Sequence, residues 1–70
     1  MRKWLIMARK DRLLTQMGVA SRVGISRAYY AQLELRQRNP SIHVARSIAR
    51  LLGFDWVLFY EEETGAGSAS

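Results

Sequence analysis

The sequence contains no cysteine, one proline and one histidine. Without cysteine, the chain can form neither a disulfide framework nor a thiolate metal site, and this composition suits a reducing, cytosolic compartment. His43 has no second histidine and no carboxylate pair near it in the sequence, so we interpret it as part of a solvated helix face and expect no metal or cofactor. No apolar run reaches the roughly 18 residues that a membrane span requires, so no membrane partner is expected.

Acidic residues are scarce in the first part of the chain. Residues 1–50 carry all eleven lysines and arginines against only Asp11 and Glu34, which gives this part a net charge of +9. Residues 51–70 carry four acids and no base, and the whole chain has a net charge of +5. A basic body with an acidic end indicates a polyanionic partner on one side of the molecule.

The spacing of apolar residues is helical along most of the chain, and no strand pattern is present. It predicts helices over 2–12, 16–23, 27–35, 42–52 and a short last one over 56–60. Residues that end or start helices stand at the expected places, as N-caps at Thr15, Ser26, Ser41 and Asp55 and as C-terminal glycines at Gly24 and Gly53. The fourth helix is expected to turn a set of apolar residues inward, namely Ile42, Ala45, Ile48, Ala49 and Leu52.

These elements predict an all-α fold in a single small domain. The domain covers residues 1–60, and a chain of 70 residues has room for only a small core. Residues 61–70, EEETGAGSAS, have almost nothing to bury, so we expect a disordered tail there.

The stretch RVGISRAYYAQLE, residues 22–34, interrupts a helix for a tight turn and restarts it at once. Two short helices joined in this way form a helix-turn-helix, whose second helix can enter the major groove of DNA. Its outward face offers Arg27, Ala28, Ala31 and Gln32. Arg27 suits a guanine, Gln32 suits an adenine, and Ala28 is small enough to approach a thymine methyl group. A plainer alternative leaves Arg27 in solvent or on a phosphate.

At these residues the sequence resembles the Cro/C1-type helix-turn-helix family of phage and bacterial repressors, also known as the XRE family. The resemblance covers residues 1 to about 60 and rests on LTQ at 14–16, VASRVGIS at 19–26, YYAQLE at 29–34, RNPS at 38–41 and IARLLGFDW at 48–56. It implies a compact, lambda-repressor-like five-helix bundle, sequence-specific operator binding and a homodimer.

The resemblance also assigns roles to single residues. It aligns Arg27, Ala28 and Gln32 with the base-contacting positions of the family, and it implies a partly buried ion pair between Arg9 and Glu34. Three positions depart from the family pattern. Leu13 and Arg36 stand where members often have glycine, and Gly18 stands where they often have glutamate. These departures leave open the backbone path of the loop at Arg36 and the strength of the second helix.

Other residues are candidates for phosphate contacts or for a dimer interface. Gln16 begins the second helix, where unpaired N–H groups favour a phosphate. Further phosphate candidates surround the recognition helix, namely Ser26, Tyr29, Arg36, Arg38 and Asn39. Tyr29 can equally pack at the domain edge. The segment FDWVLFY is more apolar than a last turn needs, so Trp56 and Phe59 are candidates for a dimer interface as well as for the core.

The leading functional hypothesis is a transcriptional regulator, most simply a repressor, that binds a palindromic double-stranded operator as a homodimer on the nucleoid of the cytoplasm. An antitoxin, a controller protein of a restriction–modification system, or an interaction module that has lost DNA binding are the alternatives. No enzyme is expected, because the sequence offers no acid–base pair, no nucleophile–histidine arrangement and no phosphate loop such as GxxxxGK. No small-molecule ligand is evident either.

Overall fold

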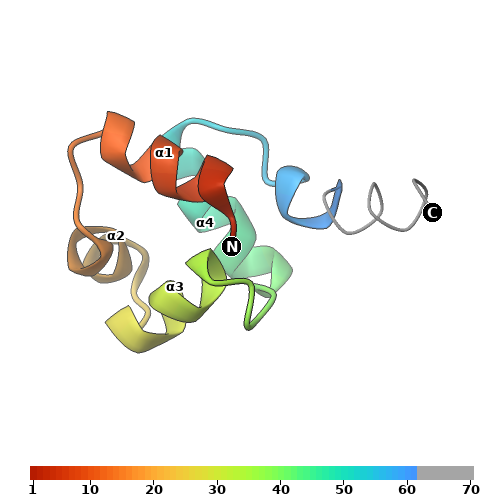
Figure 1. Cartoon of the computed structure of the whole chain (residues 1–70), viewed down its shortest axis with the longest axis horizontal. Coiled ribbons are helices and arrows are strands. Elements are labelled where there is room, and N and C mark those ends of the chain that lie inside the picture. The colour runs from red at the N-terminus through yellow and green to blue at the C-terminus, as the bar shows by residue number, and fades with distance from the viewer. Residues whose placement is uncertain (62–70) are drawn as a thin grey trace.

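A computed structural model of the chain describes residues 1–61, and all regular structure in that part is helical. The helices are α1 (Lys3–Asp11), α2 (Gln16–Val23), α3 (Arg27–Glu34) and α4 (Ile42–Leu52), shown in Figure 1. A last helical segment starts at residue 58, two residues later than expected. The boundaries expected for the first four helices agree with these to within one residue. Apart from its first residue, the expected tail over 61–70 lies outside the described residues.

Capping side chains set the starts of three helices. The Thr15 hydroxyl accepts a hydrogen bond from the Gly18 amide, and Ser26 and Ser41 cap α3 and α4 in the same way. Gly24 and Gly53 end α2 and α4 in the left-handed conformation, with φ of 78° and 81°. Glycine adopts this conformation without a steric cost, which is why both helices stop where the sequence predicts.

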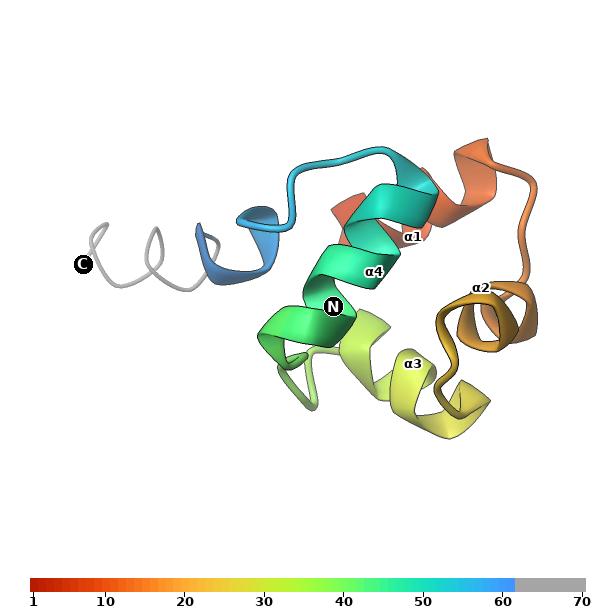
Figure 2. The same ribbon diagram turned by 180° about the vertical axis from the view of Figure 1, so that it is seen from behind.

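The helices enclose one apolar core. Figures 1 and 2, which view the molecule from opposite sides, place α1 and α4 on opposite faces, α3 along the lower edge and α2 beside it. Three aromatic rings pack together at the side of the core beside the first residues of the chain. The centroid of the Trp4 ring lies 5.0 Å from that of Phe54 and 5.1 Å from that of Phe59. The buried apolar residues of the core are Leu5, Val19, Ala20, Tyr30, Leu33, Ala45, Ile48, Leu52 and Phe59. Nowhere in residues 1–61 is a helix long and apolar enough to cross a membrane.

Two sequence-based expectations about burial need correction. Ile42 does not face inward but is 56% exposed, because it is the first residue of α4 and lies beyond the edge of the core. Phe59 is completely buried within its own chain, so its side chain has no surface left for a dimer interface. Trp56 packs edge to face against the Tyr60 ring and is only partly buried, so it keeps exposed surface.

The two positions where the family often has glycine take the conformation that glycine would take. Leu13 has φ 58° and Arg36 has φ 61°. The left-handed conformation costs an L-residue with a side chain roughly 1–2 kcal/mol. The loop at Arg36 therefore follows a glycine-like path despite the substitution, and both residues hold a strained backbone.

Candidate nucleic-acid interface

The third helix is anchored on one side and open on the other. Tyr30 and Leu33 are fully buried beneath it, whereas Arg27 and Ala28 are exposed at its first turn. Ala31 and Gln32 are half-buried further along. The helical period of 3.6 residues puts Tyr30 and Leu33 on one face and Ala28 on the opposite one. Arg27 is exposed as the first residue of the helix. The residues expected to read bases therefore lie on the solvent side or at its border.

A chain of polar contacts joins the exposed start of α3 to the interior. Arg27 donates from Nη1 to Oε1 of Gln16 at 3.2 Å, which links the starts of α3 and α2. Gln16 in turn donates from Nε2 to Oε1 of Glu34 at 2.9 Å. Arg9 completes the chain through an ion pair with Glu34, in which Nε lies 2.7 Å from Oε2. Arg9 and Glu34 are the two residues for which the family resemblance implies such a pair.

Burial and hydrogen bonding act in opposite directions on the Glu34 carboxyl. Burial raises its pKa, but the hydrogen bonds from Arg9 and Gln16 outweigh burial, so the pKa stays below its usual value and the group remains ionised. The hydrogen bond to Glu34 likewise raises the pKa of Arg9. Burial, together with the neighbouring carboxylate, raises the pKa of the Tyr30 hydroxyl. The polar chain thus has a fixed charge state near neutral pH.

The bridge to Gln16 orients Arg27 without exhausting its donors. A guanidinium group has five N–H donors in a planar fork, and this contact uses one of them. The remaining donors include the pair that a guanine requires. Gln16 retains a second amide hydrogen and stands at the start of α2, where unpaired backbone N–H groups attract an anion.

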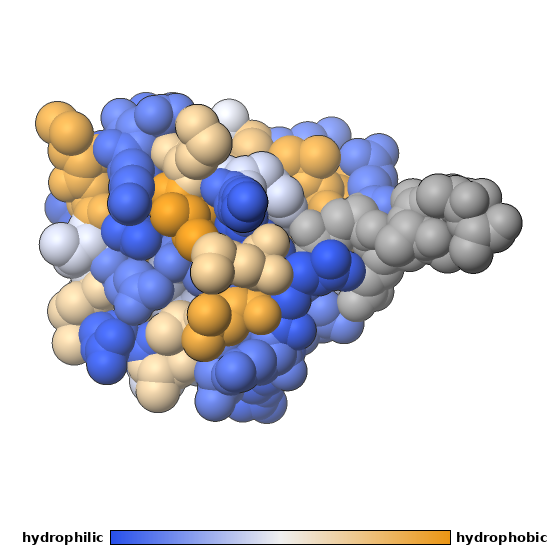
Figure 3. Space-filling model, in the orientation of Figure 1, coloured by the Kyte–Doolittle hydropathy of each residue, from blue (hydrophilic) through white to orange (hydrophobic). Residues whose placement is uncertain are grey.

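The loop between α3 and α4 carries further cations just beyond the end of α3. Arg36 and Arg38 are both exposed, and the Arg38 guanidinium lies 4.9 Å from the centre of the Tyr29 ring. Tyr29 therefore packs at the edge of the domain and also supports Arg38, a candidate for a phosphate contact. The surface over this loop is mainly hydrophilic in Figure 3, at the lower edge of the molecule.

Two phosphate candidates already have structural tasks. The Ser26 hydroxyl caps α3 by accepting from the Tyr29 amide at 3.0 Å. Asn39 accepts a hydrogen bond through Oδ1 from Nη2 of Arg2 at 2.7 Å. Arg2 is the residue that sequence reasoning missed, because it reads as one more cation in a basic stretch and yet is only 1% exposed.

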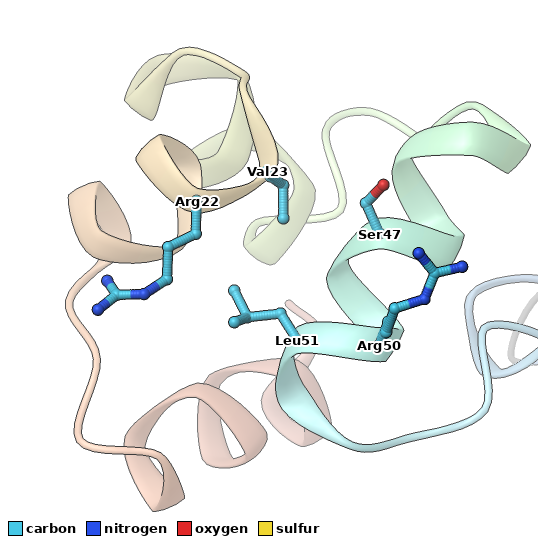
Figure 4. A pocket seen from close by; sticks show the side chains of 5 residues that line it. All are labelled: Arg22, Val23, Ser47, Arg50 and Leu51. Atoms are coloured by element: carbon cyan, nitrogen blue, oxygen red, sulfur yellow. The ribbon is translucent and has the colours of Figure 1, made fainter.

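Other surface features of the described residues do not bring polar side chains together in the same way. A hollow of about 380 Å³ lies between α2 and α4. Val23 and Leu51 face it in Figure 4. Its two arginines, Arg22 and Arg50, point away from one another, and Arg22 donates back to the Gly18 carbonyl of its own helix. Over residues 1–61 no three histidine or acidic side chains gather where they could hold a metal ion. His43 lies exposed on α4.

Comparison with known proteins gives a consistent result. A family model described as "Helix-turn-helix" matches residues 5–59. The chain is 45% identical to an uncharacterized HTH-type transcriptional regulator, YqaF, of Bacillus subtilis, over 89% of this chain and 82% of that protein. It is 40% identical to another uncharacterized HTH-type transcriptional regulator, from Methanothermobacter thermautotrophicus, over 83% of this chain and 87% of that protein. It is also 38% identical to the immunity repressor protein of Bacillus phage phi105, over 80% of this chain and 39% of that repressor. No solved structure gave a significant match.

Proposed function

Because the chain belongs to the Cro/C1-type helix-turn-helix family of DNA-binding transcriptional regulators, we propose that it is a repressor of this kind. In this proposal it binds a palindromic operator as a homodimer, with α3 in the major groove. The observation that carries the proposal is the hydrogen bond between Gln16 and Arg27. It connects an exposed arginine at the start of α3 to a series of polar contacts that ends at the buried Glu34.

Three residues of α3 are proposed to read base edges. Arg27 pairs with O6 and N7 of a guanine, Gln32 pairs with an adenine, and Ala28 contacts a thymine methyl group. A bidentate pair of this kind discriminates by about 1–3 kcal/mol against a wrong base. The anchored bridge supports Arg27 most directly, because an arginine already ordered in the unbound protein loses less conformational entropy on binding.

Phosphate contacts are proposed on both sides of α3. Gln16 would bind a phosphate at the start of α2, and Arg36 and Arg38 would bind one from the α3–α4 loop. Ser26, Tyr29 and Asn39 border these positions. Contacts of this type position α3 in the groove but carry no sequence information.

A single recognition helix reads too few base pairs to select one site in a genome, so a dimer on two half-sites is proposed. The half-sites would lie about 34 Å apart, one turn of DNA. Trp56, which keeps exposed surface beside Tyr60, is the candidate contact between the two subunits. A bound dimer would repress by excluding polymerase from the same DNA, on the nucleoid in the cytoplasm.

Selection of bound DNA from a random-sequence pool tests this function. We expect wild-type protein to enrich an inverted repeat with half-site centres about ten base pairs apart. Arg27→Ala should lose its preference at one base per half-site, whereas the matched variant Arg22→Ala should select the wild-type sequence. Arg22 is an exposed arginine on α2 that points back along its own helix, so it controls for loss of one charge.

Two results would oppose the proposal in different ways. An unchanged base preference in Arg27→Ala would remove Arg27 as a base reader while leaving operator binding intact. Absence of any enriched sequence, with only weak salt-sensitive binding, would indicate a protein-interaction module built on the same fold.

A further inference from the structure

The arginine at position 2 is the most deeply buried charged side chain of the described residues, at 1% exposure. Its Nη1 donates to the Leu33 carbonyl at 2.6 Å and to the Arg38 carbonyl at 3.0 Å. Its Nη2 donates to Oδ1 of Asn39 at 2.7 Å. One guanidinium group therefore bonds both the last turn of α3 and the loop that follows it.

The backbone of the same residue also holds α3. The Arg2 amide donates to the Glu34 carbonyl at 2.7 Å, beside the bond from its side chain to Leu33. The last carbonyls of a helix have no partners within the helix and carry a partial negative charge, so a cation with N–H donors suits this position. Figures 1 and 2 both place the start of the chain against this end of α3.

The guanidinium also contacts the last helical segment. The guanidinium carbon lies 5.4 Å from the centre of the Phe59 ring. The residue after Phe59, Tyr60, contacts the loop directly, because its hydroxyl donates to the Pro40 carbonyl at 2.8 Å. The loop over residues 36–40 is therefore held at Arg38 and Asn39 by Arg2 and at Pro40 by the last helical segment.

A residue that only filled space here would not need a charge. Burying a cation is costly, and a methionine would cover the Phe59 ring without that cost. A planar fork, in contrast, places two nitrogens at once, Nη1 on the Leu33 and Arg38 carbonyls and Nη2 on Asn39. Methionine has no donor, and the single nitrogen of lysine cannot occupy both positions. What arginine adds at this position is thus a fixed geometry between α3 and the α3–α4 loop, because its guanidinium bonds both.

We propose that Arg2 is a positioning residue for DNA binding, which ties the end of α3 to the α3–α4 loop and so holds Arg36 and Arg38 where they reach phosphates. This inference rests on the proposed function. Arg2 is itself buried and does not touch DNA. Its loss lets the loop move relative to α3, so that phosphate contacts fail while the helix-turn-helix stays folded.

The first test compares the salt dependence of DNA binding for wild type and Arg2→Lys, under conditions where both are folded. Lysine keeps the charge, but its single nitrogen cannot reproduce the bonds that Arg2 makes from two nitrogens. Each lost phosphate contact reduces the slope of log affinity against log salt by about 0.9. We expect Arg2→Lys to flatten the slope of a bound dimer by about 2, one contact per subunit, and to bind about tenfold more weakly at low salt.

Ile48→Val is the matched control for stability. Ile48 is fully buried in α4, so removal of one methyl group lowers stability modestly without touching the loop. A purely structural role of Arg2 would leave both variants with the wild-type slope, and that result would overturn the proposal. A flattened slope in Ile48→Val as well would also overturn it, because general destabilisation would then explain the effect.

Amide hydrogen exchange tests the positioning without DNA. The amides of Arg36 and Gln37 bond the carbonyls of Leu33 and Gln32 at the end of α3. In Arg2→Lys we expect their protection to fall about tenfold relative to the Gly53 amide, which bonds within α4. Unchanged relative protection would show that Arg2 does not hold the loop. If wild type selects no DNA, the proposed function fails, while this measurement still decides whether Arg2 fixes the loop.

Discussion

At the scale of single residues, the strained positions Leu13 and Arg36 are informative. Both hold a left-handed backbone, with φ of 58° and 61°. Leu13 is 93% exposed, so its side chain contributes little burial to offset that strain. In Figure 3 the surface over the α1–α2 connection is correspondingly apolar. Strain without burial means that a glycine at this position would fit the fold better.

We expect Leu13→Gly to stabilise the protein by roughly 1 kcal/mol, because relief of the left-handed strain exceeds the added flexibility of the unfolded chain. In a domain of this size that is a rise in Tm of about 4–8 °C, which thermal unfolding measures directly. Gly24→Ala is the mirror-image control. Its φ is 78° and a Cβ there meets nothing within 4 Å, so any loss of stability reports the backbone alone. A lower Tm in Leu13→Gly would refute the strain argument.

The environment of Glu34 predicts how the stability of the protein depends on pH. Its pKa is lowered in the folded protein, so the stability it contributes is present above its unfolded pKa, near 4.5, and is lost as the pH falls through its folded pKa. Glu34→Ala breaks a buried ion pair and should lower the free energy of unfolding by about 3 kcal/mol at pH 7. Urea unfolding of wild type and Glu34→Ala from pH 7 to pH 3 measures the difference between their free energies of unfolding. This difference should narrow below pH 4.5. A difference that stayed constant over this range would contradict the role of the ionised pair.

At the scale of elements, α3 is capped at its start by one residue that is also proposed to lie beside a phosphate. Ser26 accepts a hydrogen bond from the Tyr29 amide and is also a proposed neighbour of a phosphate. An aspartate would cap the helix equally well and suit its dipole, yet its charge would repel DNA. Substitutions at this position therefore separate folding from binding.

We expect Ser26→Ala to lose about 1 kcal/mol of stability through the missing cap. Ser26→Asp should unfold at the wild-type temperature but bind operator DNA more weakly. Thermal unfolding gives the Tm of each variant, and a DNA titration gives the affinity of each for operator DNA. Wild-type affinity in Ser26→Asp would place Ser26 away from the phosphates.

At the scale of the whole molecule, the separation of charge predicts how binding responds to salt. The first fifty residues are strongly basic, and all the acids beyond Glu34 lie in the last part of the chain. The proposed phosphate contacts number about three per subunit, so a bound dimer should show a slope of about −5 for log affinity against log salt. A slope near −3 at saturating operator would instead describe a single bound subunit. Fluorescence titration at several salt concentrations distinguishes the two.

Much of this protein is determined by local sequence alone. Thr15, Ser26 and Ser41 start helices and Gly24 and Gly53 end them, because capping bonds and left-handed turns depend only on neighbouring residues. The helical period is likewise sufficient to place Ala28 on the exposed face of α3 and Tyr30 beneath it. Such features need no knowledge of distant parts of the chain, and for that reason four helices could be predicted almost to the residue.

Only the tertiary structure decided which residues meet across the chain. Arg2 and Asn39 are 37 positions apart, and nothing in either neighbourhood marks them as partners. Phe59 looked equally suited to a core or to an interface until the packing of Trp4 and Phe54 enclosed it. Periodicity gives the direction of a side chain from its own helix, but burial depends on what covers that side. In the described residues, the first turn of the chain and the last helical segment supply this cover.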